Sequence, residues 1–122
     1  MQRAPSLVAI VDDEESVRRA LGRLVRSAGF HVQTFASGAD FLHSLSGSTP
    51  QCVVLDLRMP HMSGAEVIAA LRLRRPGLPV VVCSGYDRDG RGPVQADAYL
   101  PKPFRIDHLE RTLAKLLPLR SV

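Results

Sequence analysis

The stretch CVVLD at residues 52–56 is a short apolar run that ends on a carboxylate. A continuous apolar run of this length is typical of a strand that is covered on both faces in a parallel α/β sheet. A second such run, LVAIV at residues 7–11, ends on the acid pair Asp12-Asp13. The carboxyl ends of parallel strands lie at one edge of the sheet, where ligands bind. The sequence therefore predicts that Asp12, Asp13 and Asp56 meet at this edge.

Two further polar residues are expected at the same edge. Ser84 follows the apolar run 79–83, and Lys102 comes shortly after the stretch 97–100. Three carboxylates in one place repel each other, and a divalent cation is the natural remedy for that repulsion. A cleft with three carboxylates, one hydroxyl and one ammonium group indicates a site for a metal ion and then for a phosphoryl group.

Strand-like runs alternate with segments of helical periodicity along the whole chain. Strands are predicted at residues 7–11, 31–35, 52–55, 79–83 and 97–100, and helices at residues 17–28, 37–45, 63–75 and 109–117. The run 31–35 alternates between polar and apolar residues and is therefore expected at the edge of the sheet. This alternation of strands and helices predicts an α/β fold with a parallel sheet and right-handed crossovers.

One segment, residues 85–96, interrupts the alternation. A helix belongs there, but Gly90, Gly92 and Pro93 lie within it. Inside a helix, a glycine costs about 1 kcal/mol relative to alanine and a proline costs about 3 kcal/mol. We therefore expect this helix to be shortened or missing.

Size and composition indicate one domain and argue against several classes of protein. The chain has 122 residues, of which 45% are apolar, and this is enough for a packed core. No apolar run approaches the roughly 20 residues of a membrane span or the ~7–15 residues of a signal-peptide core. A cytoplasmic location without membrane contact is therefore expected. Cys52 and Cys83 would lie too far apart for a disulfide, and we expect them to be buried thiols.

The formal charge of +4 does not by itself indicate nucleic-acid binding. Aromatic residues are few, and no recognition-helix unit follows the last expected helix. Four arginines on the polar side of the first helix are interpreted as a solvated face: Arg18, Arg19, Arg23 and Arg26. Lys102 is one of only two lysines among the 16 cationic residues, and a compact ammonium group suits a point-charge contact.

The position of Asp56 is natural for a nucleophilic carboxylate. Aspartate can form an acyl phosphate, and phosphoryl transfer depends mainly on positioning and charge neutralisation. Mg²⁺ prefers oxygen ligands of the kind that Asp12, Asp13 and Asp56 supply. Lys102 and the Ser84 hydroxyl could contact the phosphoryl oxygens. The alternative is that Asp12-Asp13 merely favours the N-terminus of the next helix through its dipole, but this explains neither Asp56 nor Lys102.

Four separated motifs make the chain similar to a known family. They are Val11-Asp12-Asp13-Glu14, then Leu55-Asp56-Leu57-Arg58-Met59-Pro60 with Met62-Ser63-Gly64, then Ser84-Gly85, and finally Lys102-Pro103-Phe104. Over about residues 6–117 the chain resembles the receiver domain of bacterial two-component response regulators, and it looks most like receivers of the FixJ type. Residues 1–122 are accordingly expected to form a single receiver domain.

The resemblance implies a fold and a metal site. The fold would be flavodoxin-like and doubly wound, with a five-stranded parallel sheet in the order 2-1-3-4-5. Asp56 would accept a phosphoryl group from the phosphohistidine of a sensor histidine kinase or a phosphotransfer protein. Mg²⁺ would be the cofactor, bound by Asp56, by Asp13 directly, by Asp12 partly through water, and by the backbone carbonyl of Arg58.

The resemblance also implies how the site would act. Lys102 would pair with the phosphoryl group, Ser84 would be the switch hydroxyl, and Tyr99 would be the aromatic residue that turns inward on activation. Activity would be limited to self-phosphorylation and autodephosphorylation at Asp56, so the chain would not be an enzyme with a separate substrate. An output domain or a partner protein would receive the signal, and a homodimer is compatible with the family.

The chain departs from the family pattern in two places. Ser84 and Lys102 are closer in sequence than in the family by roughly one helical turn, which agrees with a reduced helix in residues 85–96. In the family, the face to which that helix contributes signals to partners. Arg58 is hypothesised to contact the phosphoryl group or a partner acid and to change the dephosphorylation rate, with plain solvent exposure as the alternative. His61 is expected at the surface.

Three other functions compete with the phosphoacceptor reading. A phosphorylation-independent interaction module with the same fold could lose site residues freely, whereas this chain keeps the whole set: Asp12, Asp13, Asp56, Ser84 and Lys102. A phosphatase that resembles haloacid dehalogenases needs a second acid two residues after its nucleophile, where this chain has Arg58. A Walker-type nucleotide site needs a glycine-rich lysine motif that the chain lacks.

Overall fold

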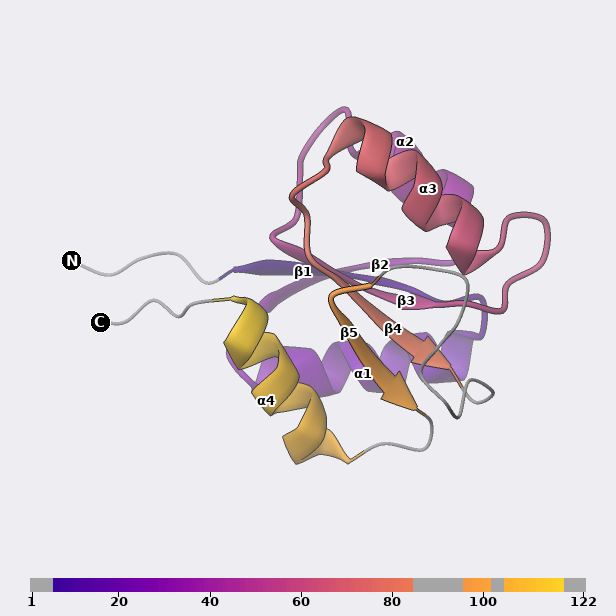
Figure 1. Cartoon of the computed structure of the whole chain (residues 1–122). Helices are drawn as coiled ribbons and strands as arrows, with labels where there is room; N and C mark the ends of the chain where they lie inside the picture. The colour runs from indigo at the N-terminus through magenta and orange to yellow at the C-terminus, as the bar shows by residue number, and fades with distance from the viewer. Residues whose placement is uncertain (1–5, 85–95, 102–104, 118–122) are drawn as a thin grey trace.

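The computed structural model describes residues 6–84, 96–101 and 105–117, without the side chains of Ser84 and Pro101 (Figure 1). Its elements, in chain order, are β1 (Leu7–Val11), α1 (Glu15–Ser27), β2 (His31–Phe35), α2 (Gly38–Ser44), β3 (Cys52–Asp56), α3 (Gly64–Arg74), β4 (Val80–Ser84), β5 (Ala98–Pro101) and α4 (Ile106–Leu116). All of the strands and helices predicted from periodicity are present; β1 and β2 match the predicted bounds, and the ends of the other elements shift by at most three residues.

The strands form one parallel sheet in the order β2-β1-β3-β4-β5, as expected for the flavodoxin-like fold. Helices α2 and α3 cover one face, and α1 and α4 cover the other (Figure 1). Strand β2 lies at the edge, as its alternating sequence predicts, and most of its residues are exposed. The covered inner strands explain why β1, β3 and β4 are continuously apolar.

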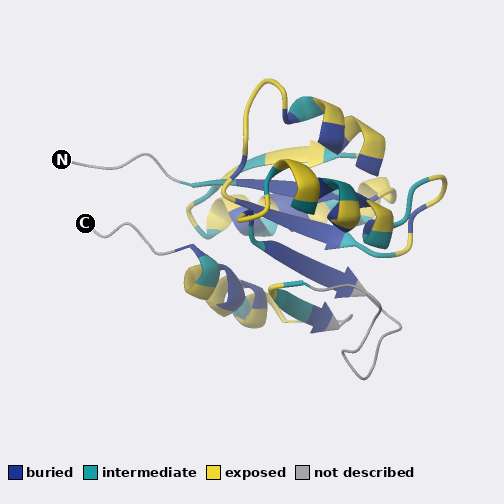
Figure 2. Cartoon of the chain, turned by 45° about the horizontal axis from the view of Figure 1, so that its top comes forward, coloured by how far each residue is buried: buried dark blue, intermediate teal, exposed yellow. Residues whose placement is uncertain are grey.

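Alternate residues of each inner strand face two separate cores. On the α2 and α3 side, Val53 and Leu55 of β3 pack in one buried cluster, whereas Cys52 and Val54 pack in the other cluster against α1 and α4. Figure 2 shows these strands as buried and the outer helix faces as exposed. The two cores hold the sheet rigidly from both sides, so the carboxyl ends of its strands form a fixed platform.

The helix that follows β3 begins with a capping box. The Ser63 hydroxyl accepts a hydrogen bond from the Glu66 backbone N–H at 3.2 Å, and the Glu66 carboxylate accepts one from the Ser63 N–H at 2.9 Å. Two backbone donors at the start of α3 are thereby satisfied. This confirms the helix start predicted from the sequence and fixes where the loop after Asp56 must end.

Three further predictions concern the two cysteines, membrane-spanning helices and residues 85–96. Cys52 and Cys83 are buried and are not in a disulfide, as expected. Among the residues that the structure describes, no helix combines the length and apolarity that a membrane crossing requires. The expectation of a reduced helix in residues 85–96 falls almost entirely on residues 85–95, which lie outside the described part of the chain.

Candidate metal centre

Three carboxylates converge at the carboxyl end of the sheet. Asp12, Asp13 and Asp56 each offer one oxygen, and these oxygens all lie within 4.8 Å of one another. The sheet topology causes this convergence, because β1 and β3 are neighbours and Val11 is in register with Leu55. Residues that follow these two positions must reach the same point of the edge. The grouping predicted from the two apolar runs is confirmed.

Asp12 is held rigidly at the floor of the metal centre. Its side chain is only 2% exposed. The Asp12 backbone N–H donates to the carbonyl of Phe35 at 3.1 Å, and one carboxylate oxygen accepts the Glu14 backbone N–H at 2.9 Å. The Arg18 guanidinium donates to the Asp12 carbonyl at 2.9 Å. These bonds orient the carboxylate before any ligand arrives, which lowers the entropy cost of binding.

Asp56 occupies the last position of β3 and is half-buried. One of its carboxylate oxygens accepts the backbone N–H of Arg58 at 3.3 Å. The Arg58 side chain is exposed. Exposure fits both hypotheses for this residue, plain contact with solvent and contact with a bound ligand at the rim. The carboxylate is thus positioned by the backbone of its own loop and remains accessible from the edge of the sheet.

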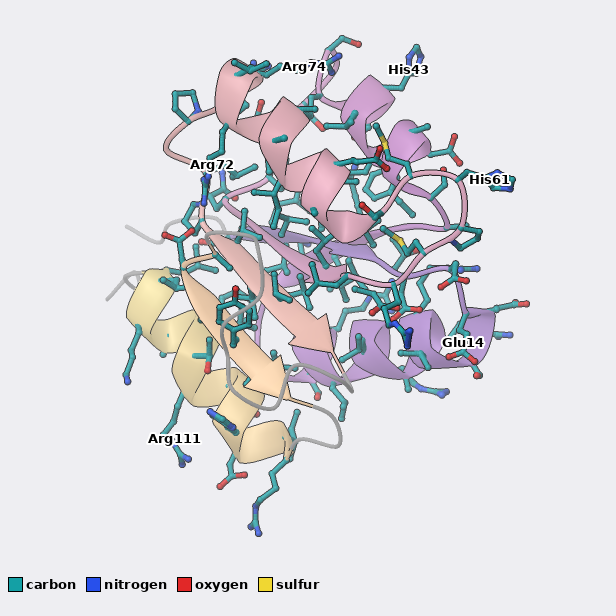
Figure 3. All side chains as sticks on the ribbon, turned by 45° about the vertical axis from the view of Figure 1, so that its right-hand side comes forward. Glu14, His43, His61, Arg72, Arg74 and Arg111 are labelled. Carbon is teal, nitrogen blue, oxygen red and sulfur yellow. The ribbon has the colours of Figure 1, made fainter. Side chains whose placement is uncertain are left out.

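The loop between β3 and α3 is tightly turned beside Asp56. His61 has a positive φ of 67°, and the Met62 N–H donates to the Pro60 carbonyl at 2.7 Å. This two-residue hydrogen bond around a positive φ is a γ-turn, which is a rare and strained conformation for a residue other than glycine. The His61 side chain is exposed and points away from the protein (Figure 3), which confirms its predicted surface position.

Gly64 contributes to the site in a way that sequence reasoning missed. A Cβ at this position would lie 2.6 Å from the Leu57 Cα and 2.8 Å from the Asp56 carbonyl oxygen. The Gly64 N–H also donates to the Leu57 carbonyl at 3.0 Å. The start of α3 therefore lies directly against the backbone of the loop between β3 and α3. The sequence signals were a glycine at the first helical position and its place in the motif Met62-Ser63-Gly64, and neither identifies the backbone that it contacts.

The donor set fits a hard divalent cation. Carboxylate oxygens are the ligands that Mg²⁺ prefers, and none of the grouped residues is the Cys or His typical of zinc. Two carboxylates about 4 Å apart repel each other by about 1 kcal/mol in water and by more where solvent is partly excluded. A cation between the three side chains removes this cost, so the geometry suits metal binding.

The remaining predicted site residues are placed only in part. The register of β3 with β4 aligns Asp56 with Cys83, which puts the backbone of Ser84 at the same edge. Tyr99 is half-buried in β5, opposite Val82, and packs against the core on the α2 and α3 side. Lys102 lies outside the described residues, so its predicted contact with the site stays a prediction.

The chain matches a known domain family. The model of the response regulator receiver domain matches residues 8–114. Among curated proteins, the DNA-binding transcriptional regulator NtrC of Escherichia coli is 40% identical over 111 residues, which cover 88% of this chain and 23% of that protein. The response regulator protein TodT of Pseudomonas putida is 34% identical and covers 98% of this chain and 54% of its own length. The chain thus spans about a quarter to a half of these relatives.

Solved structures share the fold. The chemotaxis protein CheY4 of Vibrio cholerae superposes with a TM-score of 0.85 at 27% identity, over 93% of this chain and 100% of that one. The response regulator TrrA of Thermotoga maritima, solved in complex with Mg²⁺ and BeF, gives a TM-score of 0.84 at 28% identity, over 92% and 99%. None of these matches distinguishes the FixJ type, which stays a prediction.

Proposed function

This chain belongs to the response regulator receiver domain family of two-component systems, and we propose that Asp56 is its phosphoacceptor. The observation that carries the proposal is the convergence of Asp12, Asp13 and Asp56 within 4.8 Å at the carboxyl end of the sheet. An interaction module without phosphorylation is not favoured, because such a module has no need for three carboxylates in one place.

The carboxylates of Asp12, Asp13 and Asp56 would hold Mg²⁺, with the backbone carbonyl of Arg58 as a further ligand. The complex of the similar protein TrrA with Mg²⁺ and BeF supports this assignment. When bound, Mg²⁺ neutralises negative charge on the carboxylates and on an incoming phosphoryl group. The hydrogen bonds on Asp12 keep its carboxylate oriented, so that binding the cation requires little rearrangement of this residue.

The transfer itself would use one oxygen of Asp56 as the nucleophile. This oxygen forms a bond to phosphorus while the bond from phosphorus to the donor breaks, and the donor leaves with the electron pair of that bond. The product is an acyl phosphate on Asp56. The Arg58 N–H, which already donates to Asp56, keeps the carboxylate facing the open edge. Lys102 would neutralise charge on the equatorial oxygens, and the Ser84 hydroxyl would donate a hydrogen bond to one of them.

The signal would then pass through Ser84 and Tyr99. Tyr99 lies two positions from the end of β5 and contacts the core on the side of α2 and α3. A change at the Ser84 hydroxyl would alter the packing of Tyr99 and so change a partner surface. The partners would be a sensor histidine kinase or a phosphotransfer protein and an output domain or protein. The cytoplasm would be the place of action, with no direct nucleic-acid binding by residues 1–122.

Acetyl phosphate with Mg²⁺ provides the experiment that tests this function. Intact-protein mass spectrometry should show one phosphoryl adduct, and the adduct should be absent in Asp56→Asn and without Mg²⁺. Asp40→Asn is the matched control, because Asp40 is an exposed aspartate on α2. If the folded wild-type protein binds Mg²⁺ and forms no adduct, the phosphoacceptor assignment is wrong and the interaction module becomes the better reading.

The side chain of Arg58 would adjust the lifetime of the acyl phosphate. Arg58 is exposed two residues after Asp56, while its backbone is already engaged with the Asp56 carboxylate. A guanidinium group at the rim can contact a phosphoryl oxygen or a partner acid. Arg58→Ala should change the rate at which the adduct decays. An unchanged lifetime would leave Arg58 as a solvent-exposed side chain only.

A further inference from the structure

A basic groove, which we call the arginine groove, lies along α1 beside the edge strand β2. It is lined by Arg18, Arg19, Gly22, Arg23, Arg26 and Thr34 and has a volume of about 320 Å³. The sequence suggested a solvated helix face at these arginines, whereas the structure adds a hollow between them. We propose that the arginine groove binds an acidic segment of a partner protein in an extended conformation.

Helical spacing arranges the cations in two adjacent rows. Arg18, Gly22 and Arg26 are four residues apart, and Arg19 and Arg23 form the second row. At 1.5 Å per residue, Arg19 and Arg23 are about 6 Å apart along the helix axis, and Arg18 and Arg26, with Gly22 between them, are about 12 Å apart. In an extended peptide, every second side chain lies on the same side, about 6.6 Å further along. Acids two residues apart in an extended segment therefore match Arg19 and Arg23, and acids four residues apart match Arg18 and Arg26.

Gly22 forms the hollow between the two ends of the first row. A Cβ at this position would meet Arg26 Nη1 at 3.6 Å, Thr34 Cγ2 at 3.7 Å and Val32 Cγ1 at 3.8 Å, which are ordinary contacts. Alanine would therefore fit and would favour the helix by about 1 kcal/mol. Packing does not require glycine here, whereas an open groove floor benefits from the absence of larger side chains.

Little negative charge from the protein itself neutralises the arginine groove. Arg19 is 3.5 Å from Glu15, but both side chains are about 70% exposed, and such a pair contributes little. Arg18 donates to the backbone carbonyl of Asp12 at 2.9 Å, at the end of the groove nearest the metal centre. Within the described part of the chain, neither Arg23 nor Arg26 has a carboxylate within ion-pair distance. The groove therefore presents a concentrated positive potential.

The chemistry of the lining favours carboxylates of a protein over a nucleic acid. The guanidinium fork matches a carboxylate with two parallel hydrogen bonds. The groove contains no aromatic side chain on which a base could stack. From Arg18 to Arg26 it extends about 12 Å, the length of about four extended residues. A short acidic peptide segment fits these limits.

The test measures binding of a fluorescein-labelled peptide of alternating glutamate and threonine by fluorescence anisotropy at low salt. Its reference probes are the same peptide with glutamine in place of glutamate and a short DNA duplex. Wild-type protein should bind the glutamate peptide at least about tenfold more tightly than the glutamine peptide. Added salt should weaken the binding, because exposed charges are screened.

Variants then locate the binding surface. The double variant Arg23→Gln with Arg26→Gln should lose at least about tenfold in affinity. The matched control, Arg105→Gln with Arg111→Gln, removes the same charge from exposed arginines near and on α4 and should bind like wild type. Gly22→Met should also weaken binding, although its charge is unchanged, because the side chain fills the floor. Circular dichroism and acetyl phosphate labelling verify that each variant is folded and that the acceptor site is intact.

The outcomes distinguish the proposal from its rivals. Equal binding of the glutamate and glutamine peptides would overturn it, as would an equal loss in the α4 control variant. Tighter binding of the DNA duplex, lost in Arg23→Gln with Arg26→Gln, would replace the acidic peptide with a nucleic acid. The result does not depend on phosphorylation of Asp56, so the two proposals can fail separately.

Discussion

The two ends of the sheet are built in opposite ways. At the carboxyl end, Asp12, Asp13 and Asp56 bring three like charges within 4.8 Å. At the amino end, the Arg72 guanidinium lies 3.3 Å from the Asp97 carboxylate and also donates to the Leu78 carbonyl at 2.8 Å. Figure 3 shows Arg72 and Arg74 at one end of the molecule and Glu14 and His61 at the other.

The amino end is a network in which opposite charges and backbone groups satisfy each other. The Asp97 carboxylate also accepts the Val80 N–H at 2.7 Å, and so joins the starts of β4 and β5. Arg74 donates to the Leu42 carbonyl at 3.0 Å, and Arg75 donates to the Leu45 carbonyl at 3.1 Å. These bonds satisfy carbonyls at the end of α2, where helices leave acceptors without partners.

The interactions that stabilise the fold and those that form the site therefore lie at opposite ends of the same sheet. Grouped carboxylates lower stability until a cation binds them, and the paired network at the far end helps to offset that cost. Changes at the amino end should therefore affect unfolding alone. Changes at the carboxyl end should affect phosphoryl acceptance, and their effect on unfolding should depend on Mg²⁺.

The largest loss of stability is expected at the carboxyl end, where Gly64 packs against the loop between β3 and α3. Gly64→Ala should lower the free energy of unfolding by about 1–3 kcal/mol, because its Cβ would overlap the backbone of Asp56 and Leu57. The displaced loop should also slow phosphoryl acceptance. Urea unfolding and adduct formation from acetyl phosphate measure the two effects. Gly77→Ala is the control, since nothing lies within 4 Å of its Cβ position, and a stable Gly64→Ala protein would refute the close contact.

The second largest loss of stability is expected when the network at the amino end loses the Asp97 carboxylate. Asp97→Ala should lower the free energy of unfolding by about 1–2 kcal/mol, because the Val80 N–H and Arg72 both lose their acceptor. Phosphoryl acceptance at Asp56 should be unchanged. Asp107→Ala removes an exposed carboxylate that pairs with Arg105 and Arg111, and should lower the free energy of unfolding much less than Asp97→Ala does. If Asp97→Ala slows acceptance, the two ends are coupled and the separation fails.

A smaller effect comes from the buried thiol of Cys52. Burial raises the pKa of Cys52 from 9.0 to about 12, and the charge of Asp97 adds to the rise. Between pH 9 and about pH 12, the folded protein therefore keeps the thiol proton that the unfolded chain loses. The stabilisation is fully present below pH 9 and is lost as the pH rises toward 12. Near pH 9.5 the free energy of unfolding should have fallen by about 1 kcal/mol or less on this account. The measurement compares how the free energy of unfolding changes with pH in wild type and in Cys52→Ala. Equal slopes would contradict it.

The smallest expected change is an increase in the free energy of unfolding. In the absence of divalent cations, Asp13→Asn should raise the free energy of unfolding by about 0.5 kcal/mol. It removes two repulsions, each reduced by salt screening to about 0.5 kcal/mol, and the loss of a favourable helix-dipole interaction of about 0.3–1 kcal/mol cancels about half of their sum. With Mg²⁺ the sign should reverse, because the ion stabilises only the wild-type cluster. Unfolding with a chelator and with Mg²⁺ measures both, and identical stabilities would argue against a metal centre.

Much of the fold was predictable because parallel α/β sheets leave a strong local pattern. The run 52–55 is apolar throughout, since β3 is covered on both faces, and β2 alternates because it lies at the edge. Ser63 and Glu66 form the capping box that their spacing predicts. The strand ends were less predictable, because β3, β4 and β5 each continue for one polar or imino-acid residue past the apolar run.

The candidate site was predictable in its members but not in its packing. Asp12, Asp13 and Asp56 stand at the ends of apolar runs, so topology alone brings them to one edge. The close approach of Gly64 and the turn at His61 could not be predicted, because they depend on how α3 docks on the loop. The expected reduction of the helix in residues 85–96 and the role of Lys102 stay predictions.

Local sequence patterns were enough to identify the residues that end the inner strands, and hence to place three carboxylates at one edge of a receiver-type sheet. Three features depend on the packing of the folded chain: the 4.8 Å grouping of these oxygens, the contact of Gly64 with the loop between β3 and α3, and the hollow between the arginines of α1. The physical reason is range. Strand ends follow from local hydrophobic patterns, whereas these distances depend on packing between elements that are far apart in the chain.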